Sequence, residues 1–133
     1  MSSFVLTLLI CLLTLPGTVR AETAEAESGV IYAVRVADAI NPVVANFIAA
    51  ELDRANAEDA RAFLLELDTP GGLDTAMRTI IQKILGSRLP VIVYVYPSGG
   101  RAASAGALIL LAADFAAMAP GTNAGAAHPV SLG

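Results

Sequence analysis

The stretch LDTPGGLDTAMRTIIQKILGSRLPVIVYVYPSGGRAASAG, residues 67–106, decides the fold of this chain. It contains two short motifs, LDTPGG at 67–72 and GGRAASAG at 99–106, and each follows an apolar run typical of a buried strand. In a parallel sheet with flanking helices, the turns at the carboxyl ends of the strands form the ligand site. The two motifs are therefore expected to meet, one as a nucleophile and the other as its oxyanion hole.

Around these motifs, apolar runs alternate with segments of helical periodicity. Strands are predicted at 29–36, 62–67, 91–95 and 115–118. Helices are predicted between them: the first begins at Asn41-Pro42, the second ends at Gly86 and the third covers 102–113. The strands show no clean apolar–polar alternation, which predicts burial on both faces. The order predicts an α/β fold of repeated βα units around a mostly parallel sheet.

The first residues are interpreted as a targeting segment. Residues 4–15 form an apolar run of 12 residues, too short for a spanning helix of roughly 20. It is typical of a secretory signal peptide covering 1–21, with cleavage after Ala21; a retained anchor is the alternative. Residues 22–28 are interpreted as a linker and 29–133 as the folded domain. The single cysteine, Cys11, lies in the signal segment, so thiolate and disulfide chemistry are excluded from the mature domain.

The composition narrows the function classes. Hydrophobic residues make up 56% of the chain and charged residues 15%, which excludes a disordered segment. The formal net charge is −4, and no cluster of basic residues is present, which argues against nucleic-acid binding. No spacing typical of a metal site is found, and neither a metal nor another cofactor is expected.

Ser104 is the candidate nucleophile. It precedes a predicted helix turn, where the unpaired N–H of Ala105 can point at a reacting carbonyl. The alternative is a serine that simply caps the helix. Gly71 and Gly72 are the partner motif: a glycine N–H, that of Gly72 supported by Gly71, would supply the second donor. The alternatives are a plain strand-to-helix turn and a site for a phosphate or an extended peptide. A side chain at Gly72 is expected to crowd the position of the substrate carbonyl.

Candidates for the general base are few. His128 is the only histidine and has a pKa suited to the role. A loop histidine bonded to the backbone is the alternative. Lys83, the only lysine, is interpreted as a solvated surface charge on the second helix. Asp74 is interpreted as a helix cap, and Asp68 as a loop residue or a partner of Arg101.

Taken together, the motifs resemble those of the Clp protease and crotonase superfamily. LDTPGG at 67–72, AASAG at 102–106, APGTN at 119–123 and GAAHP at 125–129 look most like the N-terminal protease domain of NfeD membrane proteins. The resemblance implies a ClpP/crotonase-like fold, incomplete at the C-terminus. It also implies a serine endopeptidase with Ser104 as nucleophile and an oxyanion hole formed by Gly72, Ala105 and Gly71.

The same resemblance implies a lysine base well after the serine. No lysine follows Ser104 in this sequence, so the base is expected beyond Gly133, and this chain alone is expected to be inactive. His128, which matches the histidine base of Clp proteases, is the second choice. A homo-oligomer is expected, membrane-associated and with its protease domain outside the cytoplasm, acting on a peptide or a stomatin-like membrane protein. Alternatives are a non-catalytic peptide-binding scaffold and a crotonase-like thioester enzyme.

Overall fold

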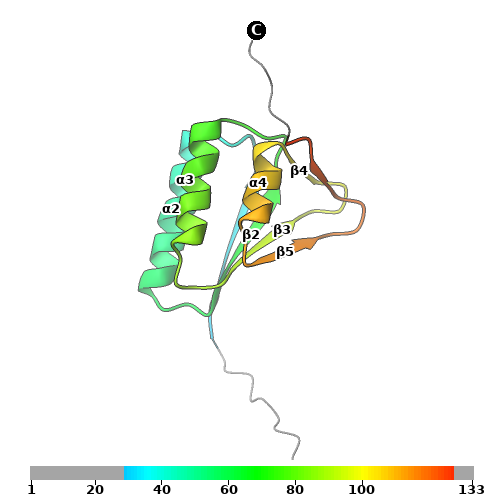
Figure 1. Cartoon of the computed structure of the whole chain (residues 1–133). Helices are drawn as coiled ribbons and strands as arrows, with labels where there is room; N and C mark the ends of the chain where they lie inside the picture. Colours follow the sequence, from blue (N-terminus) through cyan, green and yellow to red (C-terminus); the bar gives the residue numbers. More distant parts are fainter. Residues whose placement is uncertain (1–28, 128–133) are drawn as a thin grey trace, which may run out of the picture.

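The computed structural model describes residues 29–127 (Figure 1). The proposed signal peptide and linker, residues 1–28, and the candidate base His128 lie outside this part of the chain. The elements are β1 (Ile31–Ala37), α2 (Pro42–Ala57), β2 (Ala62–Asp68), α3 (Asp74–Leu85), β3 (Val91–Val95), β4 (Arg101–Ala103), α4 (Ala105–Leu111), β5 (Phe115–Met118) and β6 (Asn123–Gly125). No helix within 29–127 is long and apolar enough to cross a membrane.

The main sheet has four parallel strands in the order β1-β2-β3-β5. Because this order runs in one direction, right-handed crossovers place every connecting helix on the same face. Figure 1 shows α2, α3 and α4 as one layer beside the sheet. The expectation of burial on both faces is therefore wrong for this part of the chain. Residues 91, 93 and 95 of β3 are buried under the helices, whereas residues 92 and 94 on the other face are only half-buried.

The core lies between the helix layer and the sheet. Its largest fully buried side chains come from both layers: Ile48, Leu52, Phe63, Leu65, Leu67, Ile80, Val91, Val93, Val95 and Ile109. Local signals determine the helix ends. The side chain of Asn41 accepts a hydrogen bond from the N–H of Val44 at 3.0 Å, which confirms the predicted start of α2. Gly86 is the C-cap of α3, as predicted.

A second, two-stranded parallel sheet formed by β4 and β6 lies at the carboxyl edge of the main sheet (Figure 1). An isolated bridge joins Thr69, which follows β2, to Ala102 in β4. The predicted third helix is thereby corrected: residues 101–103 are a strand, and the helix begins only at Ala105. Strand β6 escapes sequence analysis because it has three small or polar residues and is stabilised only by distant partners.

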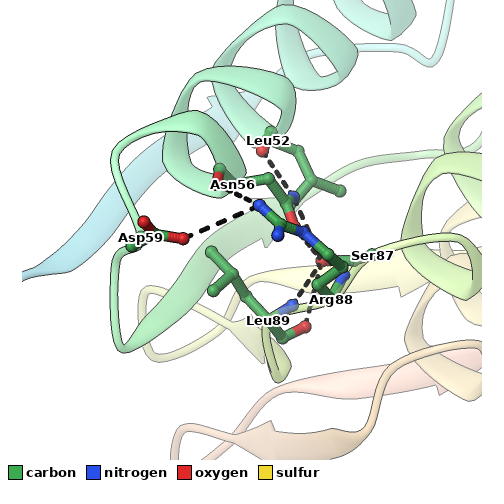
Figure 2. Close-up of polar contacts among 6 residues, drawn as sticks. All are labelled: Leu52, Asn56, Asp59, Ser87, Arg88 and Leu89. Carbon is green, nitrogen blue, oxygen red and sulfur yellow. Dashed lines mark hydrogen bonds and ion pairs between the residues drawn. The ribbon is translucent and has the colours of Figure 1, made fainter.

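At the opposite, amino edge, a polar cluster joins the end of α2 to the loop after α3 (Figure 2). The amide nitrogen of Asn56 donates to the Leu52 carbonyl at 2.8 Å and to the Ser87 hydroxyl at 3.2 Å. Its amide oxygen accepts the N–H of Arg88 at 3.0 Å, and the Arg88 guanidinium donates to the Asn56 carbonyl at 2.8 Å. This cluster joins α2 to the loop after α3 at the edge of the sheet opposite the two motifs.

Candidate active site

Ser104 lies alone between strand β4 and helix α4. The strand ends at Ala103, the helix begins at Ala105, and the serine is exposed. Its side chain occupies the N-cap position but forms no capping hydrogen bond. The interpretation of Ser104 as an ordinary helix cap is therefore wrong, and its hydroxyl is left available for other chemistry.

The backbone of Ser104 is strained, with φ +51° and ψ −115°. These angles are those of the first central residue of a type II′ turn, a position that glycine dominates because a Cβ crowds the main chain there. A non-glycine residue in such a region costs about 1–3 kcal/mol, and residues of this kind cluster at functional sites. The strand–serine–helix arrangement is also the geometry of a nucleophile elbow, which lifts a serine hydroxyl clear of its neighbours.

The strain is maintained by contacts on both sides of the serine. The N–H of Ser104 donates to the carbonyl of Gly125 in β6 at 2.7 Å. The carbonyl of Ser104 accepts from Ala107 at 3.0 Å. Hydrogen bonds thus fix the N–H of Ser104 to the small sheet and its carbonyl to α4. Gly125 was not among the sequence-predicted site residues, because no local pattern marks it.

Gly71 lies against the serine. A Cβ added at Gly71 would be 2.8 Å from the Cβ of Ser104 and 3.4 Å from its Oγ, and the φ of Gly71 is +114°. Gly72 faces elsewhere: a Cβ there would be 2.0 Å from the carbonyl oxygen of Ile40. Crowding of the serine is therefore a property of Gly71, and the expectation that a Gly72 side chain would crowd the site is wrong.

Two N–H groups, one in the glycine turn and one directly after the serine, remain open. The Gly71 N–H is occupied by the hydroxyl of Thr69 at 3.2 Å. The bridge between Ile40 and Gly72 uses the carbonyl of Gly71 and the N–H of Leu73, and not the N–H of Gly72. Within residues 29–127, the N–H groups of Gly72 and Ala105 form no hydrogen bond. The predicted pair of donors is thus unused, as an oxyanion hole requires.

Two carboxylates near the motifs have structural partners. Asp68 accepts the backbone N–H of Arg101 through Oδ1 at 3.0 Å, so it does pair with Arg101, but through the main chain. Asp74 is the first residue of α3, not its cap, because Leu73 occupies the N-cap position. Its carboxylate instead pairs with Arg78 one helical turn later at 2.7 Å.

Of the two side chains considered as bases, the structure describes only Lys83. The Lys83 ammonium pairs with Asp53 of α2 at 2.6 Å, near the C-terminal end of α3, as expected for a surface charge. His128 lies outside the described residues, and its role stays a prediction. In the part of the chain that is described, no group of three or more His, Cys, Asp or Glu side chains could hold a metal ion.

A cleft of about 560 Å³ opens next to the glycine turn. Its polar wall is formed by Asp38, Asp68, Arg101 and Asn123, and Pro70 joins it to the turn. Ser104 is not part of its lining.

With this geometry established, comparison with known proteins assigns the family. The profile of the family described as NfeD1b, N-terminal domain, matches residues 30–132. The chain belongs to this family. Membrane protein NfeD1b of Bacillus subtilis is 38% identical over 104 residues, which are 78% of this chain and 23% of that protein. Membrane-bound protease PH1510 of Pyrococcus horikoshii is 53% identical over 76 residues, 57% of this chain and 17% of that protein. The NfeD resemblance of the motifs is thus confirmed, and the chain spans less than a quarter of either relative.

Solved structures confirm the α/β fold. A Ser-to-Ala variant of the 1510-N membrane-bound stomatin-specific protease superposes with a TM-score of 0.76 at 40% identity, covering 80% of this chain and 51% of that one. A Lys-to-Ala variant of 1510-N in complex with a substrate peptide gives 0.76 at 41% identity, covering 80% and 48%. An Asn-to-Asp variant of ClpP1 from Listeria monocytogenes gives 0.63 at 26% identity, covering 68% and 52%. The chain therefore spans about half the length of each of these three solved chains.

Proposed function

We propose that this chain carries the nucleophile and the oxyanion hole of a serine endopeptidase. The observation that carries the proposal is Ser104 itself, an exposed serine whose side chain caps nothing and whose backbone adopts a conformation suited to glycine. A folded protein retains such strain where the function needs it. The names of its relatives, a membrane-bound protease and a stomatin-specific protease, support this chemistry.

In the proposed reaction, the Oγ of Ser104 attacks the carbonyl carbon of a peptide bond. The carbonyl oxygen becomes an oxyanion and is bound by the N–H groups of Gly72 and Ala105. Each such donor contributes about 3–4 kcal/mol to stabilising the transition state. Gly71 supports the hole by leaving room: with no side chain, it lets the turn approach the serine closely.

The general base is proposed to be a lysine located after Gly133. In 1510-N, the lysine replaced in the peptide complex follows the serine replaced in the other variant by more residues than separate Ser104 from Gly133. Within residues 29–127 the only lysine is already paired with Asp53, which is consistent with a base supplied elsewhere. His128 is the alternative base.

The substrate is proposed to be a peptide or a stomatin-like membrane protein, on the analogy of the 1510-N protease and its substrate-peptide complex. Membrane association is proposed from the names of the relatives. Export by the 1–21 segment, a protease domain outside the cytoplasm and a homo-oligomeric state complete the proposal.

The direct test is Ser104→Ala in the full-length protein, assayed by peptide hydrolysis and by labelling with a serine-directed fluorophosphonate. We expect both to disappear while the thermal midpoint stays within a few degrees of wild type. Ser98→Ala is the matched control, because Ser98 is an exposed serine in the preceding loop, and it should keep both activities. Hydrolysis that survives in the Ser104→Ala protein would remove this serine from the mechanism.

A second candidate function is a non-catalytic peptide-binding scaffold, which is favoured by the lack of a base beside Ser104 among the described residues. The same assay separates the two functions. A scaffold would bind peptide equally well with serine or alanine at position 104 and would not be labelled. His128→Ala in the full-length protein then tests the alternative base: a loss of turnover would promote His128 over a later lysine.

A further inference from the structure

Thr69 has more contacts with the proposed site than its place in a turn suggests. It is the only fully buried polar side chain within residues 29–127. Its hydroxyl donates to the carbonyl of Gly71 at 3.2 Å and accepts the N–H of the same residue at 3.2 Å. One hydroxyl therefore holds both polar groups of the glycine that lies against Ser104, and the next N–H along the turn, that of Gly72, is left open.

The main chain of Thr69 reaches the other half of the site. Its N–H donates to the carbonyl of Arg101 at 2.7 Å, and its carbonyl accepts the N–H of Ala103 at 3.1 Å. These bonds fix strand β4, which leads directly into Ser104. The glycine turn and the serine turn are thus joined through the backbone of a single residue.

The methyl group of Thr69 supports helix α4. A Cβ added at Gly106, in the first turn of that helix, would lie 2.4 Å from the Thr69 Cγ2. Its other neighbours would be at ordinary contact distances, 3.5 Å from the Cβ of Ala102 and 3.9 Å from the Cδ2 of Leu67. The methyl therefore limits how closely the start of α4, and with it the N–H of Ala105, approaches the glycine turn.

We infer that Thr69 is the positioning residue of the oxyanion hole: its hydroxyl orients the Gly72 N–H, and its methyl sets the position of the Ala105 N–H. The inference rests on the proposed function. Its physical basis is the narrow tolerance of the hole, because donors must lie about 2.7–3.1 Å from the developing oxyanion. A misplacement of about 1 Å can cost roughly a hundredfold in rate.

The first experiment replaces Thr69 by valine in the full-length protein, which keeps the methyl and removes both hydroxyl bonds. We expect kcat per folded molecule to fall by about tenfold to a hundredfold, with KM unchanged. Affinity for a peptide boronate, which mimics the tetrahedral intermediate, should fall by the same factor. Thr79→Val is the matched control, since it removes a hydroxyl bond to the Thr75 carbonyl on α3 and should change neither quantity.

The second experiment tests the methyl and does not depend on the valine variant folding. Gly106→Ala should lower kcat, because the new methyl clashes with the Thr69 Cγ2. Thr69→Ser removes that Cγ2 and keeps the hydroxyl, so the double variant Gly106→Ala with Thr69→Ser should regain most of the lost kcat. Because kcat is measured per folded molecule in all three variants, a clash that only destabilised the fold would change the thermal midpoint and leave kcat unchanged.

The outcomes separate this inference from the proposed function. If the wild-type protein hydrolyses peptides through Ser104 but Thr69→Val behaves like Thr79→Val, the positioning role is overturned and the protease remains. A double variant as slow as Gly106→Ala alone would also overturn it. If the wild-type protein shows no hydrolysis that depends on Ser104, the proposed function fails, and the inference fails with it.

Discussion

A methyl group added at Gly71 should mainly lower turnover, whereas one added at Gly72 should mainly lower stability, because the two positions face different parts of the molecule. At Gly71 the closest atoms belong to the site: the Cβ of Ser104 at 2.8 Å and the carbonyl oxygen of Ala103 at 3.2 Å. At Gly72 they belong to the backbone of Ile40, with the carbonyl oxygen at 2.0 Å and the nitrogen at 2.6 Å. The first substitution tests catalytic geometry and the second tests stability.

The magnitudes follow from these distances. For Gly72→Ala, a contact of 2.0 Å with a backbone oxygen forces the Ile40 bridge to open, and the positive φ adds strain. Together these effects should lower the free energy of unfolding by about 2–6 kcal/mol. The thermal midpoint should then fall by about 8 °C or more. For Gly71→Ala, a contact of 2.8 Å with the Ser104 Cβ forces the serine to shift, and backbone strain costs about 1–3 kcal/mol.

We expect Gly71→Ala to lower kcat by up to about a hundredfold per folded molecule, because displacement of a reacting group is costly even when it is small. The assay measures thermal unfolding by circular dichroism and peptide hydrolysis in the full-length protein, with kcat corrected for the folded fraction. Wild-type kcat in the folded Gly71→Ala protein would show that Gly71 does not set the position of the serine. An unchanged midpoint for Gly72→Ala would refute the assignment of its Cβ direction.

Two further predictions concern stability away from the site. Asn56→Ala removes the side-chain bonds of the α2 cluster (Figure 2) and should lower the free energy of unfolding by about 1–3 kcal/mol while leaving kcat per folded molecule unchanged; a loss of kcat would place this cluster in the mechanism. The Tyr32 hydroxyl donates to the Glu58 carboxylate, which lowers the pKa of Glu58 and raises the pKa of Tyr32. This stabilisation is fully present between the ordinary pKa values of 4.5 and 10.0, and is lost as pH falls through the lowered value or rises through the raised one. The midpoint difference between wild type and Tyr32→Phe should therefore be greatest near neutral pH and vanish at both extremes, and a difference independent of pH would contradict the linkage.

The elements that could be predicted from sequence are those with local causes. Asn41 and Pro42 mark a helix start by capping chemistry that needs no distant partner. The continuous apolar run at 91–95 predicts β3 at its observed bounds. Strands β4 and β6 have three residues each and exist only because they pair with each other, which no local pattern encodes. The open face of the sheet also escaped prediction, because the half-buried Ile92 and Tyr94 are large hydrophobic residues and do not interrupt the apolar run formed with Val91, Val93 and Val95.

In the candidate site, too, local sequence predicts which residues take part, whereas their roles depend on distant contacts. The residue types of the two motifs were enough to select Ser104, Gly71 and Gly72. Their individual roles depend on distant contacts: the bridge to Ile40 turns the Cβ direction of Gly72 away from the serine, and the bond to Gly125 fixes the backbone of Ser104. Thr69 belongs to the LDTPGG motif, but the motif does not predict its role, because burial of its hydroxyl and the contact of its methyl with α4 depend on the three-dimensional fold.

Replacing Ser104 by glycine rather than alanine tests whether strain is stored at the nucleophile. Both variants lack the hydroxyl and should be inactive, so activity does not confuse the comparison. Alanine keeps a Cβ in the conformation at φ +51° and ψ −115°, whereas glycine adopts it readily. Relief of strain is worth about 1–3 kcal/mol and is partly offset by the extra flexibility of glycine in the unfolded chain, about 0.5–1 kcal/mol.

The glycine variant should therefore be more stable than the alanine variant by about 1 kcal/mol, with a thermal midpoint higher by about 4–8 °C. Most glycine substitutions destabilise a protein, so this sign is not what a generic effect would produce. The Cβ that lies against Gly71 is kept by alanine and lost in glycine, so the loss of this contact works against the glycine variant, and a higher midpoint for glycine would come from relief of strain. Equal midpoints, or a lower one for glycine, would mean that the backbone at 104 is relaxed. The strained serine would then no longer support a catalytic role, and the case for hydrolysis would rest on the family alone.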